Sequence, residues 1–169
     1  MTDPIAEPTG QEYKLLANLP FADPETEAVA RIGADLAQPV TPGPEGAPEI
    51  NTERFLVYAF VPDDVDRKAA TDLFGQDTNL TLVVTDPEAE GERVADPIIE
   101  SMVKIALSLA AVPGGSGLIV TDYSASSIVL RFSDGQVTFN QDWPGWQAVP
   151  AALALAPTPR RMVSLRGRT

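Results

Sequence analysis

The side chains that most hydrolytic enzymes use are missing from this sequence. Its 169 residues include no histidine and no cysteine, which excludes a Ser-His-Asp triad, a thiolate nucleophile and a zinc-type ligand set. A serine nucleophile in the hydroxyl-rich segment 122–127, DYSASS, would need a lysine or a carboxylate as its base. We interpret this segment as a connection between two strands, and we expect no catalytic residue in the chain.

Glycines and acidic residues form the other patterns that suggest chemistry. The run 113–117, PGGSG, follows a predicted helix and precedes a predicted strand, which reverses the order of a phosphate-binding loop, and it carries no lysine. It is typical of a helix end and a turn. Acids gather at 63–66 and 88–92 without the glycine and terminal glutamate of a calcium loop. They indicate a helix start and a solvated loop, and no metal or cofactor is predicted.

Both tryptophans lie in the segment 139–146, FNQDWPGW, beside a carboxylate and two amides. Tryptophan is enriched among the residues that contribute most to protein interfaces. The segment therefore predicts partner-binding roles for Trp143, Trp146 and Asp142. Tyr123, from the segment 122–127, is assigned to the same contact set. An alternative stays open, in which both indoles cover an edge of the core; a large loss of stability on substitution by alanine would favour it.

Periodicity predicts the elements that must position these residues. Strands are expected at 12–19, 54–61, 80–85, 118–123, 127–132 and 136–140, and helices at 23–37, 63–74 and 97–111. The first strand alternates as a half-buried strand would, and the last two are joined by Asp134-Gly135, which favours a type I′ hairpin. The 97–111 helix is apolar around most of its circumference, which indicates the centre of the core. Weaker signals predict a helical turn at 151–156 and a strand at 161–165.

The predicted fold class is α+β, with a largely antiparallel sheet, helices packed on one face, a long buried helix at 97–111 and a C-terminal three-stranded meander. Residues 1–10 are expected to be a flexible leader, 11–158 one domain and 159–169 a basic C-terminal tail. Within the domain, segment 38–50 holds four prolines and two glycines. It is interpreted as a surface loop or tether that can form neither a helix nor a ladder.

Charge limits the partners that the chain can bind. The net charge is −12, and four of the twelve basic residues lie in 159–169, so residues 1–158 carry eight basic and 24 acidic residues. Such a body repels nucleic acid and anionic membranes and attracts a basic protein. An alternative explanation of the charge is that the chain comes from an organism whose cytoplasmic proteins are generally acidic, in which case the charge indicates no particular partner. The polar first residues and the absence of a sufficiently long apolar stretch predict a cytoplasmic protein.

The stretch from Leu80 to Trp146 resembles the Sit-type bacterial immunity proteins, which protect cells against toxins delivered between kin cells. The features that carry the resemblance are a helix with Met102-Val103 at its centre, a stop at 112–114 (VPG), a hairpin, and a closing strand followed by 142–144 (DWP). It extends to the first strand and helix and so covers most of 11–150. Gly115-Ser116-Gly117 and the proline-rich loop depart from the family pattern, and the last 23 residues have no counterpart. The resemblance implies a non-enzymatic, toxin-neutralising protein and transfers no active-site residue.

The leading hypothesis is therefore an immunity-like protein that binds and blocks a basic toxin, as a monomer or small homo-oligomer. A second hypothesis is a structural or assembly subunit of a phage or secretion-type complex, whose proline-rich loop and termini contact its neighbours. An enzyme that uses carboxylates alone is the third, because sequence does not show whether two acids face each other across a cleft.

Overall fold

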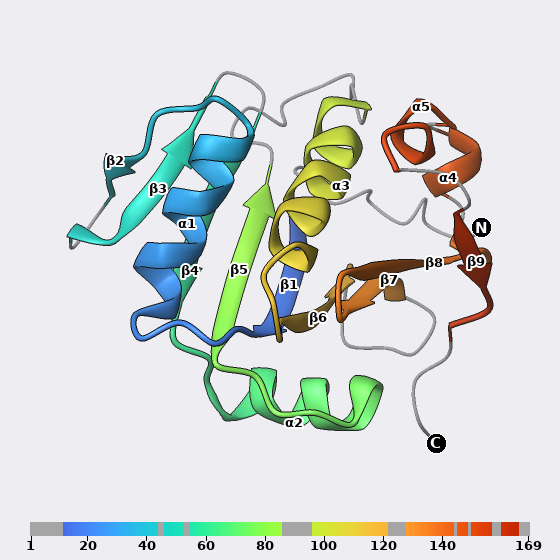
Figure 1. Ribbon diagram of the computed structural model, residues 1–169, viewed down its shortest axis with the longest axis horizontal. Helices are drawn as coiled ribbons and strands as arrows, with labels where there is room; N and C mark the ends of the chain where they lie inside the picture. The colour runs from blue at the N-terminus through green and yellow to red at the C-terminus, as the bar shows by residue number, and fades with distance from the viewer. Residues whose placement is uncertain are drawn as a thin grey trace, which may run out of the picture.

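A nine-stranded open sheet organises the chain (Figure 1). This computed structural model describes residues 12–43, 46–52, 55–85, 96–121, 128–143, 145–148, 150–156 and 160–165. Within these residues the strand order is β2-β3-β4-β5-β1-β6-β7-β8-β9. Neighbouring strands are antiparallel except β8 and β9, which are parallel. The predicted α+β class and largely antiparallel sheet are confirmed.

Most of the elements lie where their local signals predicted them. The strands are β1 (Glu12–Asn18), β2 (Thr41–Pro42), β3 (Pro48–Asn51), β4 (Leu56–Phe60), β5 (Leu80–Thr85), β6 (Ser116–Val120), β7 (Ile128–Ser133), β8 (Gln136–Asn140) and β9 (Arg161–Val163). The helices are α1 (Pro24–Asp35), α2 (Asp64–Phe74), α3 (Asp96–Ala110), α4 (Gly145–Ala148) and α5 (Pro150–Leu153).

Strand β1 is more deeply buried than its alternating sequence predicted. It lies in the middle of the sheet, where Leu15 pairs with Leu82 of β5 on one side and with Ile119 of β6 on the other. Leu16, which breaks the alternation, is also buried, because it packs on the opposite face of the sheet. The predicted alternation is otherwise confirmed: Tyr13, Leu15 and Ala17 are buried, Lys14 is half-buried, and Glu12 and Asn18 are exposed.

The proline-rich segment 38–50 contributes strands, contrary to the prediction that it forms only a loop or tether. Strand β2 pairs with β3, and β3 pairs with β4. Ile50 of β3 is fully buried and belongs to the main core. Proline can occupy short edge strands, where a missing N–H costs little, and burial of Ile50 anchors the segment to the sheet.

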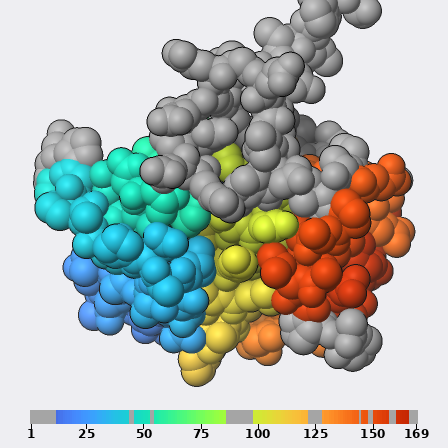
Figure 2. Space-filling view, turned by 90° about the horizontal axis from the view of Figure 1, so that it is seen from above, coloured from blue at the N-terminus to red at the C-terminus, as the bar shows by residue number. Residues whose placement is uncertain are grey.

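The helices occupy both faces of the sheet, not one face as predicted. Helices α1, α3 and α5 contribute to the main core on one face, and Figure 2 shows α3, in yellow, between the N-terminal and C-terminal parts of the chain. Helix α2 contributes Ala69 and Ala70 to a second, smaller core on the opposite face with Leu16 and Leu118. Two core layers therefore flank the sheet.

The long helix and the C-terminal meander are confirmed. Helix α3 begins and ends within one residue of the predicted 97–111, and its buried side chains supply the centre of the main core. Strands β6, β7 and β8 lie side by side in chain order. Asp134 and Gly135 have φ angles of 53° and 80°, as a type I′ turn requires. None of the described helices has the length and apolar character needed to cross a membrane.

Candidate functional site

The two tryptophans of the predicted contact set are core residues. Trp143 is 8% exposed and Trp146 is 4% exposed. Their rings meet edge to face at 4.7 Å, and each packs against one further ring: Trp143 against Tyr13 at 6.1 Å and Trp146 against Phe139 at 5.3 Å. Burial of this kind favours the alternative interpretation, in which the indoles close an edge of the core. The prediction that they form an exposed aromatic surface is corrected.

Buried Asn140, which the sequence analysis did not single out, organises this corner. Its side-chain amide donates to the carbonyl of Ile128 at 2.6 Å, and its side-chain oxygen accepts from the backbone N–H groups of Asp142 and Leu165 at 3.1 Å. Its own carbonyl accepts from the indole N–H of Trp146 at 2.9 Å. Asn140 thus holds β7, the segment after β8 and the end of β9 together, a structural role.

The other members of the predicted contact set do not complete a surface with the tryptophans. Asp142 is exposed, and its carboxylate accepts a hydrogen bond from the Ser164 hydroxyl. Tyr123 lies outside the described residues, as do the hydroxyl-rich segment 122–127 and the acidic cluster 88–92. Of the described members of the set, Asp142 alone is accessible to a partner.

The glycine-rich run after α3 forms the predicted helix end. Gly114 has a φ of 78°, and the N–H of Gly115 donates to the carbonyl of Val112 at 3.0 Å. A Ser-x-x-Lys spacing, which the sequence analysis overlooked, occurs in α3 at Ser101 and Lys104. Ser101 is buried, whereas Lys104 is exposed, so the two residues lie in different environments.

The first turn of α2 contains a buried carboxylate. Asp63 caps the helix by accepting from the N–H of Asp66 at 2.8 Å. The side chain of Asp66 is buried, accepts from the Thr81 hydroxyl at 2.8 Å and lies 3.9 Å from the Lys14 ammonium. Thr81 pairs with Phe60 of β4. Asp66, Thr81 and Lys14 therefore lie where α2 meets the sheet, and β4 is the neighbouring strand.

Strand β4 presents apolar side chains on the α2 side of the sheet, and we name Leu56, Tyr58 and Phe60 the β4 surface. Val57 and Ala59 point the other way and are buried in the main core, whereas the three residues of the β4 surface are half-buried. The rings of Tyr58 and Phe60 stack at 6.2 Å with an interplanar angle of 28°. Two adjacent aromatic rings are thus partly accessible on one strand.

Acidic residues border the β4 surface, and we name Glu12, Glu49, Asp63 and Asp64 the acidic rim. Glu49 pairs with Tyr58 across the β3–β4 ladder. Glu12 lies on β1, and both it and the two aspartates at the start of α2 are exposed. Glu49 is the ladder partner of Tyr58, the charge of Glu12 acts on the Tyr58 phenol, and Asp63 and Asp64 follow Phe60 within four residues of the chain.

Burial and one member of the acidic rim, Glu12, both act on the pKa of Tyr58. Partial burial raises the pKa of the Tyr58 phenol above its usual value, the charge of Glu12 raises it further, and Lys14 opposes the shift. These directions are expected because burial and a nearby negative charge both disfavour a phenolate. At neutral pH the phenol is therefore an uncharged hydrogen-bonding group in an acidic surrounding.

Two exposed valines lie next to the β4 surface in the chain. Val61, immediately after β4, is 65% exposed, and Val65 in the first turn of α2 is 60% exposed. The sequence of 54–61, RFLVYAFV, predicts a well-buried strand, because every position is aromatic, aliphatic or small except the first. The structure instead leaves Leu56, Tyr58 and Phe60 half-buried. The signal that could have identified the surface was the alternation of larger residues at 56, 58 and 60 with Val57 and Ala59.

Comparison of the chain with protein-family models, curated proteins and solved structures finds no match. The resemblance to Sit-type immunity proteins therefore stays a prediction. Among the described residues, no group of three or more acidic side chains is arranged to hold a metal ion.

Proposed function

We propose that this chain is a non-enzymatic, cytoplasmic, immunity-like protein that binds and neutralises a basic toxin, and that the β4 surface is its contact site. The observation that carries the proposal is the stacked, half-exposed pair of Tyr58 and Phe60 inside a rim of acidic side chains. Aromatic residues surrounded by polar groups are the usual centre of a protein interface.

Charge supports a basic partner. The excess of acids over bases in residues 1–158 attracts a positively charged protein over long range, and the rim would orient it on the aromatic pair. Binding of this kind weakens as salt screens the charges, because the Debye length falls to about 8 Å at physiological ionic strength. A contact set centred on Tyr58 and Phe60 takes the place of the tryptophan pair.

The test begins with capture of a partner from a lysate of the native cells, with a low-salt wash followed by a high-salt wash. The captured protein is identified by mass spectrometry and purified, and its affinity for the wild type and for the double variant Tyr58→Ser, Phe60→Ser is measured. We expect the double variant to bind at least about thirtyfold more weakly, because each ring is at the centre of the interface. Val40→Ser, in the exposed connection between α1 and β2, is the matched apolar control.

Neutralisation is tested in growing cells that express the captured protein. Growth should stop without this chain, recover with the wild type or Val40→Ser, and fail to recover with the double variant. A captured protein that does not impair growth contradicts the immunity function. Equal binding by the wild type and the folded double variant contradicts the β4 surface as the contact site.

The open sheet favours a second candidate, the assembly subunit. In the described part of the chain, β2 and β9 lie at the two ends of the sheet order, and edge strands can pair with another chain. A subunit of this kind would self-associate or recover only structural proteins in the capture experiment. Size-exclusion chromatography with light scattering distinguishes this outcome from a monomeric inhibitor.

A further inference from the structure

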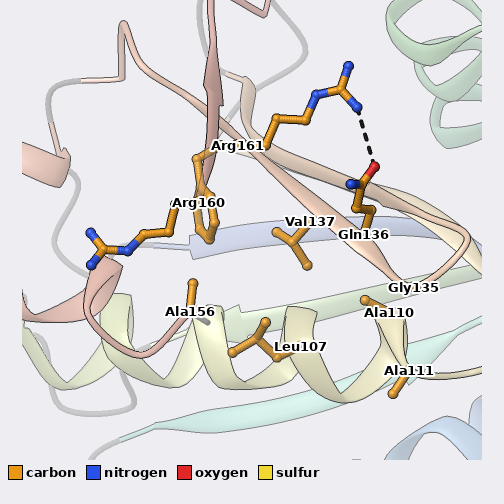
Figure 3. Close-up of a pocket in the computed structure, with 10 residues that line it drawn as sticks. Leu107, Ala110, Ala111, Gly135, Gln136, Val137, Ala156, Arg160 and Arg161 are labelled. Carbon is orange, nitrogen blue, oxygen red and sulfur yellow. Dashed lines mark hydrogen bonds between the residues drawn. The ribbon is translucent and has the colours of Figure 1, made fainter. Parts of the chain in front are cut away.

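A pocket at the opposite end of the sheet has no part in the proposed function. It encloses about 290 Å³ between the C-terminal half of α3, the β7–β8 hairpin and the segment that leads into β9 (Figure 3). Pockets for small ligands run from about 300 to 1,000 Å³, so this one suits a small molecule. It lies on the helix side of the sheet edge, away from the β4 surface.

Apolar side chains from three elements line the pocket. Leu107 of α3, Val137 of β8 and Ala156 beyond α5 face one another across it in Figure 3, and Ala110 continues the lining toward the end of α3. Leu107 and Val137 are half-buried, so covering them with a ligand would remove further apolar area from water. Such burial contributes about 25 cal/mol for each Å².

Basic side chains border this pocket in an otherwise acidic protein. Arg160 lies at the Ala156 end, and Arg161 extends the other way, where it donates to the Gln136 side chain at 3.3 Å. Both arginines are exposed, and no ion pair joins either of them to a carboxylate within the described residues. The guanidinium of Arg160 is therefore available to an anion.

Helix α3 determines the orientation of an anion in the pocket. Lys104 is exposed and lies three residues before Leu107, hence on the same stripe of the helix. The C-terminus of α3 at Ala110 carries the negative end of the helix dipole, which disfavours an anion there. The favourable position is therefore the Arg160 end of the pocket, with the apolar lining leading away from it. Lys104 does not line the pocket, but its charge lies one helical turn before Leu107.

We infer that this pocket binds a small amphiphile with one anionic head group, held by Arg160 and assisted by Lys104, whose apolar chain lies between Leu107 and Val137. A carboxylate and a phosphate share the chemistry that a guanidinium recognises. The inference is independent of the β4 surface, because it uses other residues at another edge of the sheet.

The experiment titrates the full-length, ¹⁵N-labelled protein with octanoate, octyl phosphate and octanol and follows amide chemical shifts by NMR. We expect saturable binding of the anionic probes with dissociation constants in the millimolar range or tighter, and octanol about tenfold weaker. Shifts should centre on residues 104–111, 136–139 and 160–161. The ratio of the dissociation constants of octanoate and octyl phosphate identifies the preferred head group.

Two charge-matched variants test the role of the arginine. Arg160→Gln should weaken octanoate binding about tenfold and leave octanol unchanged, since only the anion uses the guanidinium. Arg131→Gln removes the same charge from an exposed position on β7 outside the pocket and should change neither. Equal binding of octanol and the anions, an equal effect of the two variants, or no saturable shift at these residues would overturn the inference.

Discussion

The two faces of the sheet differ in how completely they are buried and in the side chains that they bury. On the face covered by α1, α3 and α5, the described side chains form one large apolar core that includes both tryptophans. On the face covered by α2, the apolar cluster is smaller, a carboxylate is buried beside a hydroxyl and an ammonium, and aromatic rings are half-exposed. The first face specifies and stabilises the fold, whereas the second leaves side chains available for recognition.

A short helix can leave part of a sheet face accessible. Helix α2 spans 11 residues and contacts the sheet near β1 and β6, so the neighbouring strand β4 keeps Tyr58 and Phe60 partly accessible. Aromatic residues on a rigid strand lose little conformational freedom when they bind, which favours affinity. We therefore expect substitutions on the two faces to change the free energy of unfolding by different amounts and for different physical reasons.

The largest effect is expected in the main core. Leu82 of β5 is fully buried beneath the α1 and α3 layer, and Leu82→Ala should lower the free energy of unfolding by about 3 kcal/mol, because it removes buried methyl groups and leaves a cavity. Urea denaturation measures the change. Val61→Ala, at a 65% exposed position, should cost less than about 0.5 kcal/mol. Similar losses from both variants would contradict the assignment of Leu82 to a packed core.

An intermediate effect is expected at the buried carboxylate on the α2 side. Asp66→Ala should cost about 2 kcal/mol, because the Thr81 hydroxyl loses its acceptor and Lys14 loses its counter-charge, which one-third exposure of the lysine moderates. Asp66→Asn should recover part of the loss by accepting from Thr81. The control Asp64→Ala removes an exposed acid from the same helix turn. If the control costs as much as Asp66→Ala, the carboxylate contributes only to the helix dipole.

The smallest effect is a pH dependence at Tyr58. Because the pKa of the phenol is raised in the folded state above its ordinary value of 10.0, the unfolded chain loses this proton first. The contribution of this phenol to the free energy of unfolding is therefore fully present below about pH 10. It is lost as the pH rises through the folded-state pKa. Tyr58→Phe should make the loss of stability between pH 9 and the alkaline limit less steep, as measured by urea denaturation at each pH. An unchanged slope would contradict partial burial of the phenol.

The sequence predicted those elements whose signals are local. The Asp134-Gly135 hairpin, strands β5 and β8, and helix α3 follow from turn chemistry and apolar periodicity, which involve residues close together in the chain. The fold class could be predicted for the same reason, because it depends on the order of elements.

The remaining features depend on contacts between distant residues. Ile50 is buried in the core because β3 pairs with β4, where Ile50 lies opposite Val57, although prolines lie close to it in the sequence. The indole of Trp146, in the short helix α4, is buried with its N–H donated to the Asn140 carbonyl. The alternation in β4 separates Tyr58 and Phe60 from Val57 and Ala59, but the sequence does not show how much of that face α2 covers, because this depends on contacts of α2 with residues of β1 and β6.

The place of β1 imposes an order on biosynthesis. Of the described strands, β1 is made first and lies at the centre of the sheet. Its neighbours β5 and β6 are made later, since Leu15 pairs with Leu82 and with Ile119. Until then an apolar strand has no native partner, and loop closure over such separations slows folding. The apolar side chains of β1 therefore stay without their native strand partners while the chain between β1 and β5 is made.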